Sequence, residues 1–508
     1  MKKFKSKLIL AFLFLFVQIG MYSCSSDTTN DEPEEEEEEV AKTLTADKSS
    51  INFDSTEGTL EITISTNVDT WVISTSGTSW LSLSESSGSA GTTSVSVTAE
   101  ANTSINDRTS TITINANAVD AVKVQVTQEG VNSTNGIYPD YNLNPLPADM
   151  TGMSSTATEI ASKISLGWNI GNTLEATGGE TAWGNPKVTK DLIDFVKASG
   201  FDAIRIPCAW DQYLADADNA KLQESWLNRV KEVVQYCVNN DMYVLLNIHW
   251  DNGWLENNIN EASKVQVNAK QKAYWEQIAT HLRDFDEHLL FASANEPAVE
   301  DAAQMAVLNS YHQTFIDAVR ATGGKNAYRT LVVQGPSTDI EKTNNLMTTL
   351  PTDTAENRMM VEVHYYTPWQ FAGLTEDASW GKMYYYWGNG YHSASDTERN
   401  ATWGEEADLQ NYFALMKTQF VDEGIPVVLG EFGAIRRTSL TGDALQLHLD
   451  SRAYYLKSVV KEAKANGLLP FYWDEGSLGN NGFGIIERSN NSVFDTQALN
   501  ALIDGLNE

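Results

Sequence analysis

The chain has 508 residues, of which 42% are hydrophobic, and its formal net charge at pH 7 is −33. That length allows two or more domains, one of them with a large core. The negative charge disfavours binding to nucleic acid and to polyanionic glycans, and it suits a neutral substrate.

The start of the chain has the features of an export signal. Four lysines within the first ten residues precede an apolar run, LILAFLFLFV, which is too short for a mature membrane span and is typical of a signal peptide over residues 1–23. The junction MYSC resembles a bacterial lipobox, which implies cleavage before Cys24 and a lipid on that cysteine. Loss of the four lysines takes the formal charge from −33 to −37.

An acidic run, DEPEEEEEE, follows within residues 24–41. Its composition predicts a solvated, self-repelling tether. The run also resembles the surface-export signal of Bacteroidetes lipoproteins, and the two interpretations are compatible. We therefore expect a lipid-anchored protein that is exposed at the surface of the cell outer membrane.

Residues 42–130 predict a small all-β, immunoglobulin-like sandwich. Segments of period two, TLEITIS, TSVSVTAE, STITINA and VKVQVTQ, are separated by Gly, Asn and Ser turns. With SWLSLS and the terminal VTQEG, this stretch resembles a BACON domain, a module often proposed to bind carbohydrate. Its aromatic residues are only Phe53, Trp71 and Trp80, next to apolar residues, so we expect both tryptophans in the core and a spacer role for the domain.

After a linker assigned to residues 131–154, short apolar segments alternate with amphipathic helical stretches such as SWLNRVKEVVQYCVNN. The expected strands read ISLGWNIGN, AIRIPCAW, YVLLNIHW, LLFASANEP, TLVVQGP, MMVEVHYY, PVVLGEFG and LLPFYWDEG. Eight β-then-α units over residues 155–508 predict an α/β fold, a (β/α)8 TIM barrel. Cys208 and Cys237 are in no metal-ligand spacing, and we expect both to be buried free thiols.

Polar and aromatic residues stand at the ends of these strands, where a barrel of this kind builds its active site. Two are carboxylates, Glu296 in the fourth segment and Glu431 in the seventh. Such a pair across the barrel mouth can cleave a glycosidic bond, because one acid protonates the leaving oxygen while the other attacks the anomeric carbon. We expect Arg205 to keep the attacking carboxylate ionised, and less charged surroundings to keep the other protonated.

The segments GWNIGNTLEA, RIPCAW, NIHWD, ANEP, VEVHYY, LGEFG and YWDEG together resemble glycoside hydrolase family 5, whose members are retaining (β/α)8 enzymes. The first segment is most similar to subfamily 4, which holds endo-β-1,4-glucanases and xyloglucanases. The resemblance implies that Glu296 is the general acid/base and Glu431 the nucleophile. It also implies that Asn295 binds the sugar 2-hydroxyl and that Arg205 and Tyr366 flank the nucleophile. His249 and His364 would hydrogen-bond the sugar at the cleavage point, and Trp473 would stack beneath it.

Aromatic residues crowd three polar loop segments, HWDNGW, YYTPWQF and YYYWGNGYH, which we interpret as sugar-stacking subsites of a long open cleft. The first segment contributes two further substrate-binding candidates, Trp250 and Trp254. Trp250 stands where many relatives have a second histidine. The histidines at strand ends share no metal-ligand spacing with other residues, and we expect neither a metal nor another cofactor.

These features predict a monomeric retaining endo-β-1,4-glucanase with xyloglucan as its preferred polysaccharide. The long aromatic loops suit a branched glucan, and a surface lipoprotein suits a polymer too large to enter the cell. Mixed-linkage β-glucan or cellulose is the alternative substrate. A glycan-binding lipoprotein without catalysis is a third reading, which the presence of both carboxylates disfavours.

Overall fold

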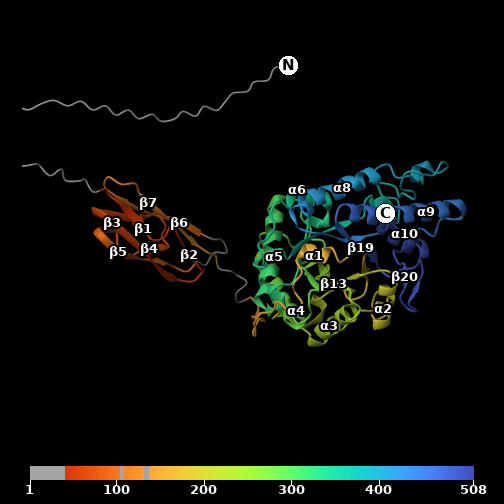
Figure 1. Cartoon of the computed structure of the whole chain (residues 1–508), viewed down its shortest axis with the longest axis horizontal. Helices are drawn as coiled ribbons and strands as arrows, with labels where there is room; N and C mark the ends of the chain where they lie inside the picture. Colours follow the sequence, from red (N-terminus) through yellow and green to blue (C-terminus); the bar gives the residue numbers. More distant parts are fainter. Residues whose placement is uncertain (1–40, 103–107, 131–136) are drawn as a thin grey trace, which may run out of the picture. The chain divides into compact units, whose positions relative to one another are not determined.

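The computed structural model describes residues 41–102, 108–130 and 137–508, which form an all-β unit and a larger α/β unit (Figure 1). The predicted signal peptide, Cys24 and the acidic run lie outside the described residues. Across those residues, we find no helix that combines the length and the apolar character needed to cross a membrane.

The N-terminal unit is a seven-stranded sheet built around one long strand, β3 (Gly58–Thr75). The middle of β3, residues 64–66, pairs with β1, and its end pairs with β6; both pairings are antiparallel. The strands follow the order β2-β7-β6-β3-β5-β4; their bounds are β1 Leu44–Ala46, β2 Ser50–Phe53, β4 Leu81–Leu83, β5 Ser87–Ala99, β6 Arg108–Ala116 and β7 Val122–Gln128. Alternate residues of β5, β6 and β7 are buried, so the predicted period-two pattern forms the core of this unit.

All three aromatic side chains of this unit are buried, as expected. The Trp71 ring lies against Gly88, where a Cβ atom would come within 2.3 Å of the ring, and its Nε1 donates to the carbonyl of Ser89 at 3.1 Å. A ring enclosed in this way has no face left for a sugar.

The larger unit is a closed barrel of eight parallel strands in the order β10-β13-β14-β16-β17-β18-β19-β9, as predicted. The strands are β9 Gly167–Ile170, β10 Ala203–Ile206, β13 Tyr243–Asn247, β14 Leu289–Ala292, β16 Leu331–Gln334, β17 Met359–Tyr365, β18 Val427–Phe432 and β19 Leu468–Asp474. Helices follow them in turn and surround the barrel (Figure 1): α2 Lys190–Ala198, α3 Glu224–Val238, α4 Lys264–Leu282, α5 Ala302–Ala321, α6 Ile340–Leu346, α8 Glu406–Gln419, α9 Gly442–Ala465 and α10 Thr496–Leu506. Cys208 and Cys237 are buried and free among these elements, as expected.

The floor of the barrel is apolar. Helix α1 (Ala157–Ala161) contributes Ala157 and Ile160 to a cluster with inward-facing strand residues such as Leu245, Val332 and Met360. Thr156 begins this helix with a capping box, in which its hydroxyl accepts from the backbone of Glu159 and the Glu159 carboxylate accepts from the backbone of Thr156. The N-terminal end of the barrel is thereby closed, and its opposite end is left for chemistry.

The described part of the predicted linker, residues 137–154, is attached to the barrel. The Tyr141 backbone donates to Glu276 Oε2 at 2.9 Å, and the Tyr141 hydroxyl donates to the carbonyl of Asn219 at 2.7 Å. Strand β8 (Leu146–Ala148) pairs with β15 (Gly323–Gly324). Residues 137–154 therefore belong structurally with the barrel, which the composition of this stretch does not reveal. The domain boundaries otherwise stay predictions.

Candidate active site

Inward-facing positions change from apolar to polar along strands such as β17 and β10. In β17 the inward residues are Met360, Glu362 and His364, spaced two apart, and all are buried. In β10 Ala203 is followed by Arg205. The carboxyl ends of the barrel strands therefore enclose a charged layer above the apolar floor.

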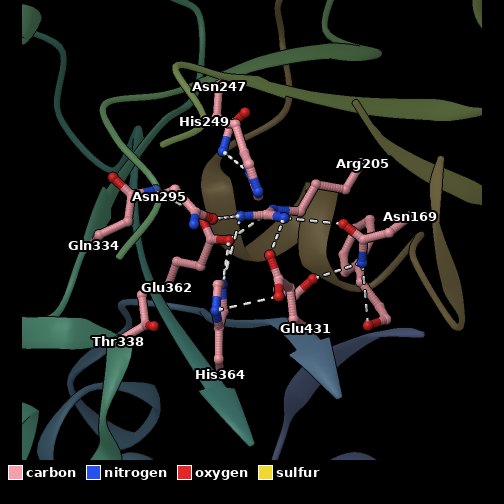
Figure 2. Close-up of polar contacts among 12 residues, drawn as sticks. Asn169, Arg205, Asn247, His249, Asn295, Gln334, Thr338, Glu362, His364 and Glu431 are labelled. Atoms are coloured by element: carbon pink, nitrogen blue, oxygen red, sulfur yellow. Dashed lines mark hydrogen bonds and ion pairs between the residues drawn. The ribbon is translucent and has the colours of Figure 1, made fainter. Parts of the chain in front are cut away.

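Arg205 is the centre of this layer and is fully buried (Figure 2). Its Nη1 donates to Glu431 Oε1 at 2.7 Å and to Asn169 Oδ1 at 3.0 Å. Its Nη2 donates to Asn295 Oδ1 at 2.8 Å, and its Nε lies 2.8 Å from Glu362 Oε1. One guanidinium thus connects strands β9, β10, β17 and β18 with the loop after β14.

Glu431 reaches the site because β18 contains a bulge. Opposite β17, Val363 pairs with Leu429 but His364 pairs with Glu431, so one extra residue of β18 is inserted between them. The extra residue, Gly430, lies where a Cβ atom would come within 2.0 Å of Glu362 Oε1. The Glu431 carboxylate, which the bulge turns inward, accepts from Arg205 and, at 3.0 Å, from the Tyr366 hydroxyl.

Glu296 lies in the loop after β14, four residues beyond the end of the strand at Ala292. The buried carboxylate of Glu256 holds this loop by accepting from the backbone N–H groups of Asn295 at 3.1 Å and Glu296 at 2.8 Å. The Glu296 side chain is 45% exposed, whereas that of Glu431 is 7% exposed. His364 Nδ1 lies 2.7 Å from Glu296 Oε1, and a carboxylate oxygen of Glu296, one of Glu431 and a His364 nitrogen all lie within 4.8 Å of one another.

The charges around the two carboxyls differ from the prediction. Burial raises the pKa of Glu431, against the opposing charges of His364 and Arg205. Burial also acts to raise the pKa of Glu296, but the hydrogen bond and charge of His364 outweigh it, and this pKa is lowered. The expectation of less charged surroundings for Glu296 is wrong, because His364 lies against it.

His364 holds a proton strongly. Burial acts to lower its pKa, but the carboxylates of Glu431, Glu296 and Glu362 outweigh burial and raise the pKa to about 9. In the free site the proton between His364 and Glu296 therefore resides on the histidine. Because the two groups are in direct contact, moving this proton to Glu296 leaves the total charge of the site unchanged.

His249 faces the site beside Trp473. The two rings stack with centroids 5.8 Å apart and planes 6° apart. Burial and the charges of Arg205 and His364 hold the pKa of His249 well below its usual value, so the ring is neutral. Asn247 Nδ2 lies 3.3 Å from His249 Nδ1; as donor, it leaves Nε2–H free to bond a substrate oxygen.

The loop aromatics divide into exposed and buried groups. Trp250 and Trp369 are exposed, and Trp250 opens a turn of four consecutive residues with positive φ, Trp250–Gly253. Trp254 is half-buried: Lys270 Nζ lies 4.8 Å from the centre of its ring, so less of that ring is available to a sugar than predicted. The polar context of the loops misled the prediction for Tyr365 and Trp387, which are buried and pack on Tyr455.

Two buried carboxylates of this site were not among the predicted residues. Glu362 precedes His364 by two residues, so the strand period was a signal that it faces inward. Glu256 had no such signal, because only the folding of the loop after β13 brings it beneath Asn295 and Glu296. Burial raises the pKa of Glu256 to about 7, with the charge of Glu296 adding to the effect.

The oxygen and nitrogen ligands of Glu296, His364 and Glu431 are close enough to share a cation. In this arrangement those atoms are already engaged: Glu431 accepts from Arg205 and Tyr366, and His364 contacts Glu296 on one side and Glu362 on the other. The geometry is therefore that of paired carboxyls held by cationic groups.

Comparison with known proteins identifies the family. Residues 169–479, well over half of the chain, match the model for Cellulase (glycosyl hydrolase family 5). The chain belongs to glycosyl hydrolase family 5. It is accordingly a glycoside hydrolase, and it is similar to endoglucanases and xyloglucan-specific glucanases of this family. Residues 43–131 match the model for the viral BACON domain, which agrees with the resemblance noted for the N-terminal unit.

Among family 5 relatives, endoglucanase A of Paenibacillus barcinonensis is 37% identical over 71% of this chain and 92% of its own length. A xyloglucan-specific endo-beta-1,4-glucanase of Bacteroides ovatus is 35% identical over 74% of this chain and 76% of its own.

Solved structures of the family agree. The Bacteroides ovatus xyloglucanase in complex with a XXXG heptasaccharide has a TM-score of 0.69 and 33% identity, covering 92% of this chain and all of that one. A xyloglucan-specific beta-1,4-glucanase from a ruminal metagenomic library is 40% identical, with a TM-score of 0.65 over 70% of this chain and 96% of that one. A broad specificity endoglucanase from Bacteroides salanitronis is 34% identical, with a TM-score of 0.62 over 72% of this chain and 98% of that one.

Proposed function

We propose that this chain is a retaining endo-β-1,4-glucanase that prefers xyloglucan, with Glu431 as nucleophile and Glu296 as general acid/base. The observation that carries the proposal is the close approach of these two carboxyls, since one oxygen of each and a His364 ring nitrogen lie within 4.8 Å of one another. Retention needs the carboxyl groups roughly 5–5.5 Å apart, whereas inversion leaves room for a water between them at roughly 6.5–9.5 Å. The short separation therefore supports retention.

In the first step a Glu431 oxygen attacks the anomeric carbon, and the bond from that carbon to the leaving oxygen breaks. The leaving oxygen takes the proton that Glu296 and His364 share. In the second step Glu296 accepts a proton from water while the water oxygen attacks the same carbon, and Glu431 leaves as a carboxylate. Arg205 and Tyr366 hold Glu431 in place through both steps.

Glu296 is suited to the acid/base role by its exposure, because the leaving group and the water both arrive from the open side of the site. Glu431 is suited to the nucleophile role by its burial and by its two hydrogen-bond donors, which orient its carboxylate toward the anomeric carbon. These positions, rather than the pKa directions of the free site, support the two assignments.

The preference for xyloglucan is supported by relatives that are named for this substrate. It is also supported by exposed tryptophans in the loops after β13 and β17, Trp250, Trp369 and Trp380, which give apolar faces to xylosyl branches as well as to a glucan backbone. Contacts with branches far from the reacting carbon can be used to lower the barrier there. The chain should therefore show a higher kcat/KM, and not only a lower KM, on tamarind-type xyloglucan than on barley-type β-glucan or carboxymethylcellulose. Equal or higher efficiency on either unbranched polymer would overturn the preference and leave the glucanase assignment intact.

A broad β-glucanase is the second candidate, because a similar structure from Bacteroides salanitronis is described as a broad specificity endoglucanase. The same three-substrate comparison decides between them. An inactive glycan-binding protein is disfavoured, since both carboxyls and all of their partners are in place.

The proposed location is the outer surface of the cell, with a lipid on Cys24 and the acidic run as tether. The basis is the charged start, the apolar run and the MYSC junction of the sequence. Cys24→Ala should release the full-length protein from the membrane fraction. Retention of this variant on membranes washed free of peripheral proteins would contradict the anchor.

A further inference from the structure

The charged layer contains one carboxylate that the two-step reaction does not use. Glu362 is fully buried in β17, beneath both catalytic carboxyls. Its Oε1 lies 2.8 Å from Arg205 Nε and 3.2 Å from His364 Nε2, and its Oε2 accepts from Gln334 Nε2 at 2.6 Å. Burying a carboxylate costs free energy unless polar groups contact it. The three contacts of Glu362 offset this cost, and they hold the carboxylate in one position.

The contact with His364 determines which ring nitrogen carries hydrogen. A carboxylate can only accept, so His364 Nε2 carries hydrogen when it bonds Glu362 at 3.2 Å. Arg205 Nη2 also approaches this nitrogen, but it is farther away, at 3.5 Å, and it donates to Asn295 Oδ1 at 2.8 Å. When the ring is neutral, its other nitrogen, Nδ1, is then a free acceptor, and Nδ1 is the atom 2.7 Å from Glu296 Oε1. In the opposite tautomer Nδ1–H would point at Glu296 and could not take up a proton from it.

We propose that Glu362 is a positioning residue, which fixes His364 in the Nε2–H tautomer so that Nδ1 exchanges one proton with Glu296. The inference rests on the proposed acid/base role of Glu296. It extends that role by assigning the proton to His364 Nδ1 between turnovers. Gln334 belongs to the same arrangement, because it donates to Glu362 and accepts from the backbone of Ala294, next to Asn295 and Glu296.

The charge of Glu362 also affects the pH at which His364 loses the proton that it shares with Glu296. The charged or titratable groups around His364 are the acids Glu296, Glu362 and Glu431, together with Arg205, Tyr366 and His249. The three acids raise the pKa of His364 to about 9, so the shared proton is present below that pH and is lost as the pH rises through it. Removing one acid lowers this pKa, by about one to three units for a charge at this distance.

The test uses the Glu362→Gln variant, which keeps the size of the side chain and removes its charge. The alkaline limb of kcat/KM on the polysaccharide should move to lower pH by at least about one unit, and kcat/KM at pH 7 should fall roughly 10- to 100-fold. Asp353→Asn is the matched control: Asp353 is also a buried partner of an arginine, Arg320, at 2.6 and 2.8 Å. Asp353→Asn should leave the alkaline limb of kcat/KM at the same pH as in the wild type.

A second readout follows His364 directly. In the wild-type protein with ¹⁵N-labelled histidine, the His364 resonances, assigned by their loss in His364→Gln, should show the Nε2–H tautomer above the titration. An Nδ1–H tautomer, or a His364 titration that Glu362→Gln leaves unchanged, would overturn the inference. A separate experiment tests the acid/base role of Glu296 itself. If the activity of Glu296→Ala did not depend on the leaving group of the substrate, that role would be contradicted.

Discussion

Because Glu296 is exposed and Glu431 is buried, a substitution at Glu296 can test its role without disturbing Glu431. In Glu296→Ala we expect Glu431 and its donors, Arg205 and Tyr366, to remain in place, so that only proton transfer is lost. Activity on the polysaccharide should fall by roughly 10²- to 10⁴-fold, the usual contribution of general acid–base catalysis. An aryl glycoside with a good leaving group needs no proton and should lose much less in the first step.

The control for this prediction is a small anion such as azide. It attacks the covalent intermediate without needing a base, so it should restore the second step in Glu296→Ala and give a glycosyl azide with the same anomeric configuration as the substrate. A variant equally impaired on aryl glycoside and polysaccharide, with no response to azide, would mean that Glu296 is not the acid/base.

At the residue scale, most of the predicted site was recoverable from the strand ends of the sequence. Arg205, Asn295, His364, Tyr366 and Glu431 form one connected set of contacts. Their joint position follows from barrel topology, which brings the carboxyl ends of all strands together. Their charge states could not be predicted, because these depend on a 2.7 Å contact between residues 68 positions apart.

At the scale of elements, the β18 bulge positions Glu431, the proposed nucleophile. Gly430→Ala would place a methyl group within 2.0 Å of the buried Glu362 Oε1, so β17 and β18 would have to separate or the bulge would shift. We expect a loss of about 1–3 kcal/mol in the free energy of unfolding and a loss of activity larger than that alone explains. Thermal unfolding and kcat/KM measured on the same sample check both effects.

Gly479→Ala is the matched control, since apart from its chain neighbours no atom of the described residues lies within 4 Å of the added Cβ. It should leave stability and activity close to wild type. A Gly430→Ala variant as active as Gly479→Ala would show that the bulge does not determine the position of Glu431.

Element positions were predictable where a pattern repeats. All eight barrel strands fall inside the apolar segments seen in the sequence, because buried parallel strands are nearly continuous hydrophobic runs. The bulge was not predictable, since LGEFG reads as an uninterrupted strand. The loop conformations were not predictable either: the Trp250–Gly253 turn is stabilised by Asp251, which accepts from the backbone of Asp211 at 2.9 Å.

At the scale of the whole molecule, the N-terminal unit and the barrel each have their own core. A chain that begins at residue 136 retains Tyr138 and Tyr141, which pack on the barrel, and removes the BACON-like unit. Because the aromatic side chains of that unit are buried, we expect kcat/KM on soluble xyloglucan to match that of a chain beginning at residue 42. A large drop, or retention of the isolated N-terminal unit in a glycan affinity gel, would argue for a binding module.

The most direct test of the account is to identify the residue that becomes covalently attached to the sugar. A 2-fluoro glycoside with a good leaving group slows the second step, so the glycosyl-enzyme accumulates and peptide mass spectrometry can locate the label. The account predicts one label per chain, on Glu431, and no label in Glu431→Gln. A label on Glu296 or any other residue, or hydrolysis with inverted configuration, would contradict it.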